Sequence, residues 1–92
     1  MAEKRLHIYV SGIVQGVFFR SNTAHKANSL RLTGWVKNLP DRRVEILVEG
    51  NEEMVDKFLD WCKEGPPNAE VDSVETMVLP FKQEFNDFKI VY

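Results

Sequence analysis

One arginine in a glycine-containing loop is the clearest candidate for chemistry in this sequence. Arg20 lies near the end of residues 14–21, Val-Gln-Gly-Val-Phe-Phe-Arg-Ser, between an alternating apolar segment and a predicted helix. Such a turn can direct several backbone N–H groups at one point, where the start of a helix adds a partial positive charge. Gly16 permits a positive φ or a close approach to a ligand. Because a guanidinium can hold two phosphate oxygens, the segment is a candidate phosphate site.

Simpler interpretations of the same residues stay open. The segment also fits an ordinary strand-to-helix turn with a surface arginine, because a single Gly-x-x-x-Arg pattern is not the eight-residue loop that binds nucleotides. Asn38 ends residues 34–38, Gly-Trp-Val-Lys-Asn, and an asparagine at the end of a strand usually belongs to a turn. Taken together, Arg20 and Asn38 favour a polar site more strongly than either residue does alone.

The remaining reactive side chains predict no metal and no other cofactor. His7 and His25 are far apart in the sequence, and no group of His, Cys and carboxylate residues has the spacing of metal ligands. Cys62 lies on an apolar helix face and is predicted to belong to the core. Trp35 and Trp61 are interpreted as packing residues. No second chemical site is therefore predicted.

Charge limits the classes of partner. The chain carries 12 basic and 14 acidic side chains, a formal net charge of −2, which gives no electrostatic case for nucleic acid or an anionic membrane. A small basic patch near Asn38 either attracts an anionic substrate or is a solvated surface. Its members are Lys37, Arg42 and Arg43.

Length and composition suit one small cytoplasmic domain over residues 1–92. No apolar run approaches the ~18–20 residues of a membrane span, and the first residues do not resemble a signal peptide. The single cysteine cannot form an intrachain disulfide and fits a reducing compartment.

Hydrophobic periodicity predicts the elements that position Arg20. Residues 6–11 alternate between apolar and polar side chains, as expected of a strand with one buried face. Residues 21–31 are predicted to form a helix with Ser21 or Asn22 as its N-cap. The narrow apolar stripe of this helix consists of Ala24, Ala27 and Leu30.

A hairpin and two later strands complete the predicted sheet. Residues 32–38 and 43–49 are expected to pair through a type I turn at residues 39–42. Further strands are predicted at about residues 71–79 and 87–92. The last strand is expected to place Phe88, Ile90 and Tyr92 on one face.

A second helix is more clearly indicated than the first. Asn51 can cap it, Glu52 and Glu53 suit the positive end of its dipole, and Gly65 with Pro66 ends it. Its buried face is expected to comprise Met54, Val55, Phe58, Leu59 and Cys62. The resulting order (βαββαβ with a short extra C-terminal strand) predicts an α+β ferredoxin-like two-layer sandwich. Two helices are expected to cover one face of an antiparallel sheet.

Two segments and the distance between them resemble the acylphosphatase family. Residues 10–20, Val-Ser-Gly-Ile-Val-Gln-Gly-Val-Phe-Phe-Arg, resemble the first signature of that family, and residues 34–38, followed by Val44 and Gly50, resemble the second. Residues 65–67, Gly-Pro-Pro, and the apolar end of the chain are also similar, so the resemblance extends over nearly the whole chain. It implies a ferredoxin-like fold and a hydrolase that cleaves the carboxyl–phosphate bond of acyl phosphates.

The resemblance also implies roles for particular residues. Arg20 would bind the phosphate, and Asn38 would orient the attacking water. The phosphate-binding amides would come from Gln15, Gly16, Val17, Phe18, Phe19 and Arg20. The implied partners are a small-molecule acyl phosphate as substrate and inorganic phosphate as product and inhibitor, with no metal, nucleic acid or membrane. The expected state is a monomer.

Three positions depart from the family pattern. The family has a glycine four residues after the catalytic asparagine, where this chain has Arg42, and many members have a glycine near the end of the first helix, where it has Arg31. Both positions favour a left-handed backbone, so each arginine is expected to cost roughly 1 kcal/mol without removing the chemistry. Phe18 replaces a small residue of many members and is expected to narrow or reshape the pocket.

Three alternative functions fit the same fold. A module that binds single-stranded RNA would need exposed aromatic residues on the sheet and usually a basic face, and neither is evident in the sequence. A metal carrier would need a Cys-x-x-Cys loop, which the sequence lacks. A catalytically silent acylphosphatase-like domain that binds only small anions or a partner protein stays open.

Overall fold

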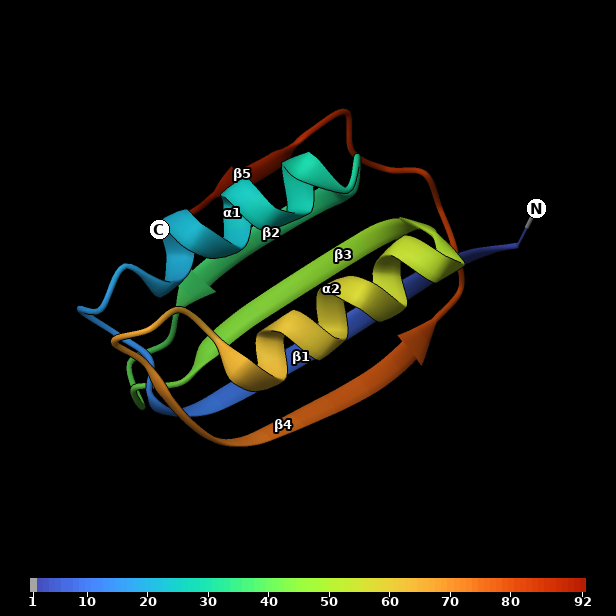
Figure 1. Cartoon of the computed structure of the whole chain (residues 1–92). Helices are drawn as coiled ribbons and strands as arrows, with labels where there is room; N and C mark the ends of the chain where they lie inside the picture. The colour runs from blue at the N-terminus through green and yellow to red at the C-terminus, as the bar shows by residue number, and fades with distance from the viewer. Residues whose placement is uncertain (1) are drawn as a thin grey trace.

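The order of strands and helices predicted from the sequence is found in the computed structural model, which describes residues 2–92 (Figure 1). In chain order the elements are β1 (Glu3–Ile13), α1 (Phe19–Ser29), β2 (Thr33–Asn38), β3 (Val44–Asn51), α2 (Glu52–Glu64), β4 (Glu70–Leu79) and β5 (Phe88–Ile90). The strands form one sheet in the order β4-β1-β3-β2-β5, and both helices cover the same face of it. The predicted α+β ferredoxin-like sandwich is therefore confirmed.

The sheet is mixed, so the prediction of an antiparallel sheet is wrong at one edge. β5 runs parallel to β2, with Gly34 beside Phe88 and Val36 beside Ile90, whereas the other strand pairs are antiparallel. The path of the chain explains this direction. β4 lies at the opposite edge of the sheet, and the segment after β4 crosses the end of the sheet at which β2 begins (Figure 1). β5 therefore starts beside the start of β2 and runs in the same direction. The strand is also shorter than predicted, and Tyr92 is 97% exposed.

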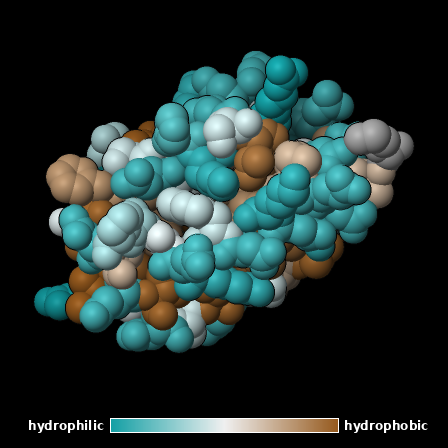
Figure 2. All heavy atoms as spheres, viewed as in Figure 1, coloured by the Kyte–Doolittle hydropathy of each residue, from teal (hydrophilic) through white to brown (hydrophobic). Residues whose placement is uncertain are grey.

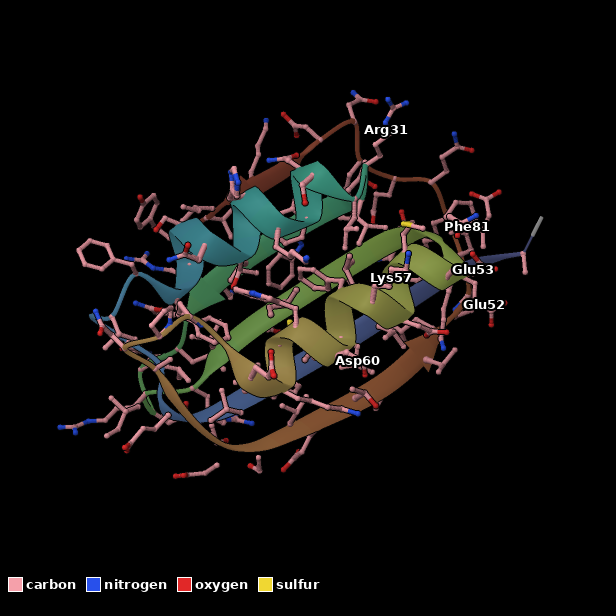
Figure 3. All side chains as sticks on the ribbon, viewed as in Figure 1. Arg31, Glu52, Glu53, Lys57, Asp60 and Phe81 are labelled. Carbon is pink, nitrogen blue, oxygen red and sulfur yellow. The ribbon has the colours of Figure 1, made fainter. Side chains whose placement is uncertain are left out.

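The core lies between the helices and the covered face of the sheet. β1 supplies Leu6, Ile8 and Val10, as its alternation predicts, and α2 supplies Val55, Phe58 and Cys62. The opposite side of α2 carries charged residues, and Lys57 and Asp60 point away from the sheet (Figure 3). Accordingly, the helix side of the molecule is mostly hydrophilic (Figure 2).

The start of α1 differs from the prediction. The helix begins at Phe19, and the residue before it, Phe18, has a left-handed φ of 62° and provides no side-chain cap. Ser21 and Asn22 are not caps: their side chains donate to the carbonyl oxygen of Phe18 at 3.2 and 2.8 Å. The buried face consists of Phe19, Thr23 and Ala27. Ala27 belongs to the predicted stripe, and the other two members of that stripe, Ala24 and Leu30, are partly buried against the core. The first amides of the helix are consequently left without side-chain acceptors beside the loop.

The ends of α2 and of the hairpin follow the predicted local chemistry. Asn51 accepts hydrogen bonds from the N–H groups of Glu53 and Met54 at 3.0 and 3.3 Å and so caps α2. The hairpin turn is closed by a 3.1 Å hydrogen bond from the Arg42 N–H to the Leu39 carbonyl. These contacts show that short-range capping and turn rules decide both boundaries.

Arg31 and Arg42 both have the left-handed backbone that their positions predict, with φ values of 58° and 77°. A side chain in this conformation costs roughly 1 kcal/mol relative to glycine. Both elements beside these residues nevertheless form, since α1 ends at Ser29 and β3 begins at Val44. The two departures from the family pattern therefore leave the fold intact.

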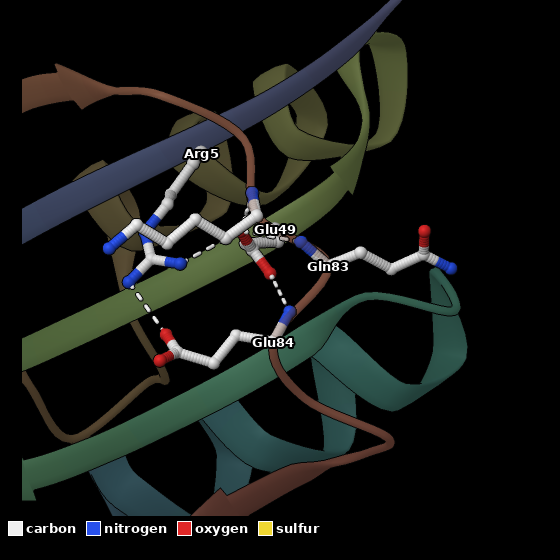
Figure 4. A network of polar contacts seen from close by, with 5 residues as sticks. Arg5, Glu49, Gln83 and Glu84 are labelled. Carbon is white, nitrogen blue, oxygen red and sulfur yellow. Dashed lines mark hydrogen bonds and ion pairs between the residues drawn. The ribbon is translucent and has the colours of Figure 1, made fainter.

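A buried ion pair attaches the segment after β4 to the sheet (Figure 4). Glu49 of β3 lies 2.9 Å from the guanidinium of Arg5, which also contacts Glu84 at 2.9 Å. The N–H groups of Lys82, Gln83 and Glu84 donate to the Glu49 carboxylate at 2.8, 3.2 and 3.0 Å. Gln83 has a φ of 52°, a conformation that lets successive amides face one anion. The network thereby fixes the segment that leads to β5.

Replacing Glu49 with glutamine should destabilise the fold by about 3–5 kcal/mol, because the buried Arg5 guanidinium would lose its buried counter-charge and keep only the half-exposed Glu84. Burial alone would raise the pKa of Glu49, but the amides of Lys82 and Glu84 and the Arg5 guanidinium hold it below its usual value of 4.5. A lowered pKa stabilises the fold above that usual value, and the stabilisation is lost as pH falls through the folded-state pKa. Urea unfolding should therefore separate wild type from Glu49→Gln at neutral pH and much less in acid.

The matched control is Glu84→Gln, since the Glu84 side chain is half-exposed and pairs with the same arginine. An exposed ion pair contributes at most ~1 kcal/mol, so this variant should unfold close to wild type. Equal losses in the two variants would contradict the importance of the buried carboxylate.

Candidate active site

A pocket of about 360 Å³ lies where the loop after β1, the start of α1 and the end of β2 meet. Its lining residues are Val14, Gly16, Phe18, Phe19, Arg20, Ser21, Asn38, Ile90 and Tyr92. Figure 1 shows the start of α1, the end of β2 and the C-terminus at the same end of the molecule. The structure therefore brings the two residues of main interest, Arg20 and Asn38, to one pocket.

The loop keeps its backbone N–H groups free. Among the hydrogen bonds between residues 2–92, none is donated by a backbone amide of residues 15–20, and the first helical bond runs from Asn22 N to Phe18 O at 3.1 Å. Gly16 has a φ of 74°, and a Cβ added there would meet no other atom within 4 Å. Left-handed backbone, not lack of space, therefore favours glycine at this position. Free amides at the positive end of α1 suit an anion.

Arg20 carries a positive charge that no acidic side chain of residues 2–92 pairs with. Its guanidinium carbon lies 5.2 Å from the ring centroid of Tyr92, which is a cation–π contact. An aromatic ring does not use up the hydrogen-bond donors of the guanidinium. The fork of Arg20 is consequently available to a ligand in the pocket.

Asn38 is the last residue of β2 and lies opposite Val44 of β3. Its side-chain oxygen Oδ1 is buried and has no hydrogen-bond partner within residues 2–92. A buried acceptor left unpaired costs about 1–3 kcal/mol, and such groups often belong to sites that bind water or ligands. The fold itself does not use this oxygen.

Two residues of the predicted phosphate loop do not line the pocket. Val17 is partly buried and packs against the core, and the Gln15 side chain turns toward the hairpin. Gln15 Nε2 donates to the carbonyl oxygens of Leu39 and Arg43 at 2.8 and 2.9 Å. The sequence offered no signal for this long-range contact. For Gln15 and Val17, the backbone amides and not the side chains therefore remain candidates for phosphate binding.

Phe18 lines the pocket from the loop, as expected of a bulky residue at this position. Its side chain is 73% exposed although its backbone is left-handed. Tyr92 and Ile90 line the pocket as well, although no pattern in the sequence predicts them as site residues. Their position depends on the parallel pairing of β5 with β2, which a local pattern cannot indicate.

The predicted basic patch is largely neutralised by neighbouring carboxylates. Lys37 lies 3.7 Å from Glu45, and Arg43 lies 2.8 Å from Asp41. Arg42 is exposed and lines a second pocket of about 410 Å³, on the Gly12–Gly16 part of the loop, rather than the pocket of Arg20. These contacts favour the interpretation of the patch as a solvated surface.

The other reactive side chains lie outside the pocket. His7 is on the helix-free face, 2.6 Å from Glu45, and His25 is exposed on α1. Cys62 is fully buried, and burial raises the pKa of its thiol. Trp61 packs against Phe19 and Phe58, as predicted for a packing residue.

Aromatic rings on the helix-free face contact cations of the same chain. Arg43 lies 4.6 Å from the ring centroid of Tyr9, and Lys37 lies 5.5 Å from that of Trp35.

Within residues 2–92, no three metal-ligating side chains lie together in a cluster. Neither α1 nor α2, the helices of that range, has the length and apolar composition of a membrane span.

Comparison with known proteins identifies the family. The model of the acylphosphatase family matches residues 6–90. An acylphosphatase of Marinobacter nauticus is 50% identical over 92 residues, which is 100% of both chains. Among solved structures, an acylphosphatase from Coxiella burnetii has a TM-score of 0.92 and 40% identity, covering 97% of this chain and 93% of that one. The acylphosphatase from Bacillus subtilis has a TM-score of 0.93 and 38% identity, covering 97% and 99%. With its fold, its two signature segments and these relatives in agreement, the chain belongs to the acylphosphatase family.

Proposed function

We propose that this chain hydrolyses the carboxyl–phosphate bond of acyl phosphates to a carboxylate and inorganic phosphate, with Arg20 holding the phosphate and Asn38 positioning the attacking water. Membership of the acylphosphatase family supports the activity. The pocket supports the roles of the residues, because it combines an arginine without a carboxylate partner, free loop amides and an unpaired asparagine oxygen. No other described pocket contains both Arg20 and Asn38.

Hydrolysis of an acyl phosphate depends mainly on the positioning of the reactants and on the stabilisation of the phosphoryl charge. An acyl phosphate is a mixed anhydride whose carboxylate leaves readily, so little acid catalysis is needed. The phosphoryl oxygens carry negative charge that shifts during transfer, and donors fixed in advance stabilise it. Arg20 and the amides of residues 15–20 supply such donors. Holding the reactants in line supplies much of the remaining rate.

In the proposed step, a water oxygen attacks phosphorus opposite the bond to the acyl oxygen. The phosphorus–oxygen bond breaks, its electron pair leaves with the carboxylate, and a proton of the water passes to a phosphate oxygen. Asn38 does not titrate and cannot be the general base, so its amide only orients the water. The unpaired Oδ1 is the acceptor that such a water requires.

A single domain, a monomer and a cytoplasmic location are proposed for this protein as well. Residues 1–92 are expected to act as one domain and as a monomer, because this domain by itself brings Arg20, Asn38 and the loop amides to one pocket. A cytoplasmic location suits the single buried thiol of Cys62. Inorganic phosphate, which is the product, should occupy the same donors as the substrate phosphate and so act as an inhibitor.

An assay with benzoyl phosphate tests the activity. Purified protein with a chelator present should hydrolyse it, as followed by absorbance, at the same rate as without the chelator. Inorganic phosphate should inhibit competitively, because it binds the same loop. Hydrolysis no faster than in buffer would contradict the proposal and favour a silent domain that binds only anions. Loss of activity in the chelator would contradict the metal-independent step.

A further inference from the structure

We propose that Gln15 is a positioning residue that holds Asn38 against the phosphate-binding loop, an inference that rests on the proposed function of the pocket. Gln15 lies in the loop itself, but its side chain does not line the pocket and instead binds the hairpin between β2 and β3. Its Nε2 atom donates to Leu39 O at 2.8 Å and to Arg43 O at 2.9 Å. One amide nitrogen thus uses its two hydrogens on the two sides of the hairpin.

These two bonds are formed at the base of the hairpin, directly beside Asn38. Leu39 follows Asn38 in the chain, and its own N–H donates to the Arg43 carbonyl at 2.8 Å. Arg43 precedes Val44, which is the strand partner of Asn38. The Gln15 amide therefore reinforces the same pair of residues that closes the hairpin behind Asn38.

Backbone pairing with β1 does not reach this end of the hairpin, where the Arg43 guanidinium lies 4.6 Å from the ring centroid of Tyr9 on that strand. β1 pairs with β3 only as far as Val10 and Val44, and beyond that point its remaining residues pair with β4 alone. The hairpin turn contains Arg42 with a φ of 77°, a left-handed conformation that costs an arginine roughly 1 kcal/mol relative to glycine. Gln15 provides the side-chain hydrogen bonds that join the loop to the hairpin among residues 2–92.

The expected consequence falls on Asn38 and not on phosphate binding. Displacement of a catalytic group by about 1 Å can lower the rate about 10²-fold. Gln15→Met has nearly the same length and no charge but lacks both donors. It should lower kcat by ~10–100-fold while the KM and the inhibition constant of inorganic phosphate change little, because Arg20 and the loop amides remain in place.

The test is a double-mutant cycle of Gln15→Met with Asn38→Ala, measured with benzoyl phosphate. If Gln15 acts through Asn38, Gln15→Met should lower kcat in the wild-type background and have almost no further effect in Asn38→Ala. The control is Gln83→Met, because Gln83 is exposed and its side chain lies outside the pocket. It should have wild-type kinetics. Circular dichroism and thermal unfolding show that each variant is folded at the assay temperature, and Gln15→Ala replaces Gln15→Met if the latter is not.

Three results would overturn the inference without refuting the proposed function. Wild-type kcat in both Gln15 variants would mean that the two hydrogen bonds do not position Asn38, and the proposed function would survive. If Gln15→Met lowered kcat equally in the wild-type and Asn38→Ala backgrounds, Gln15 would act through a group other than Asn38. A phosphate inhibition constant that rises in proportion to the loss of kcat would assign Gln15 to the phosphate loop. A wild-type protein without activity would instead refute the function and this inference together.

Discussion

Replacing Arg20 with alanine should lower kcat/KM for benzoyl phosphate by ~10³–10⁵-fold, the range that one arginine on a transferring phosphoryl group contributes. Arg20 lines the pocket and has no carboxylate partner among the described residues, so its charge is available to the substrate. The loop amides alone would remain. Steady-state kinetics together with inhibition by inorganic phosphate measure the effect, and the inhibition constant of phosphate should rise markedly.

Arg20→Lys separates charge from geometry. Lysine keeps the positive charge but cannot hold two oxygens through a planar fork, so it should recover only part of the lost activity. The control is Arg31→Ala, because Arg31 lies beyond the C-terminal end of α1 (Figure 3), whereas the pocket lies at the start of that helix. It should keep wild-type kinetics. Near-normal turnover in Arg20→Ala would contradict the role of Arg20.

Replacing Asn38 with alanine should lower kcat by ~10²–10³-fold, by analogy with removing one oriented polar group from an active site. The KM and the inhibition constant of phosphate should stay close to wild type, because Arg20 and the loop amides hold the phosphate. Loss of kcat without loss of binding indicates an interaction made mainly in the transition state. Removing the buried Oδ1, which has no partner in the fold, should also leave the stability nearly unchanged or raise it.

The control for Asn38 is Asn86→Ala, since Asn86 is exposed and does not line this pocket. Asn38→Asp supplies a further comparison, because a carboxylate at this position would repel the phosphoryl oxygens and should weaken phosphate binding as well. An unchanged kcat in Asn38→Ala with normal phosphate binding would show that the water is positioned by another group.

Much of the fold could be predicted because its signals are local. The alternation of residues 6–11, the cap at Asn51 and the glycine at position 65 each act within a few neighbours, and each element is present. The predicted start of α1 is wrong because Ser21 and Asn22 look like caps in the sequence. In the structure both side chains bind the Phe18 carbonyl, one turn back.

Features that depend on distant parts of the chain could not be predicted. The parallel pairing of β5 follows from the path of the preceding segment, which the buried Glu49 carboxylate holds through three backbone amides. That pairing also explains why Tyr92 lies beside Arg20. Likewise, nothing in residues 14–21 indicates that the Gln15 side chain reaches Leu39. Such contacts join residues with no local pattern in common.

The residues themselves predict the candidate site only in part. The family signatures pair Arg20 with Asn38, and the structure supplies the reason for the pairing, since α1 and the end of β2 border one pocket. The free amides of Phe19 and Arg20 follow from a helix that starts earlier than predicted and has no side-chain cap. Their availability to an anion is therefore a property of the fold that propensities alone do not give.

A crystal structure with inorganic phosphate bound would test the proposed site most directly. We predict one tetrahedral anion held by the Arg20 guanidinium and by backbone N–H groups of residues 15–20, with the Asn38 side chain facing it across a water. A phosphate bound elsewhere, with the Arg20 guanidinium turned out of the pocket and the loop amides donating to neighbouring carbonyls, would contradict the mechanism and leave only the family and the fold.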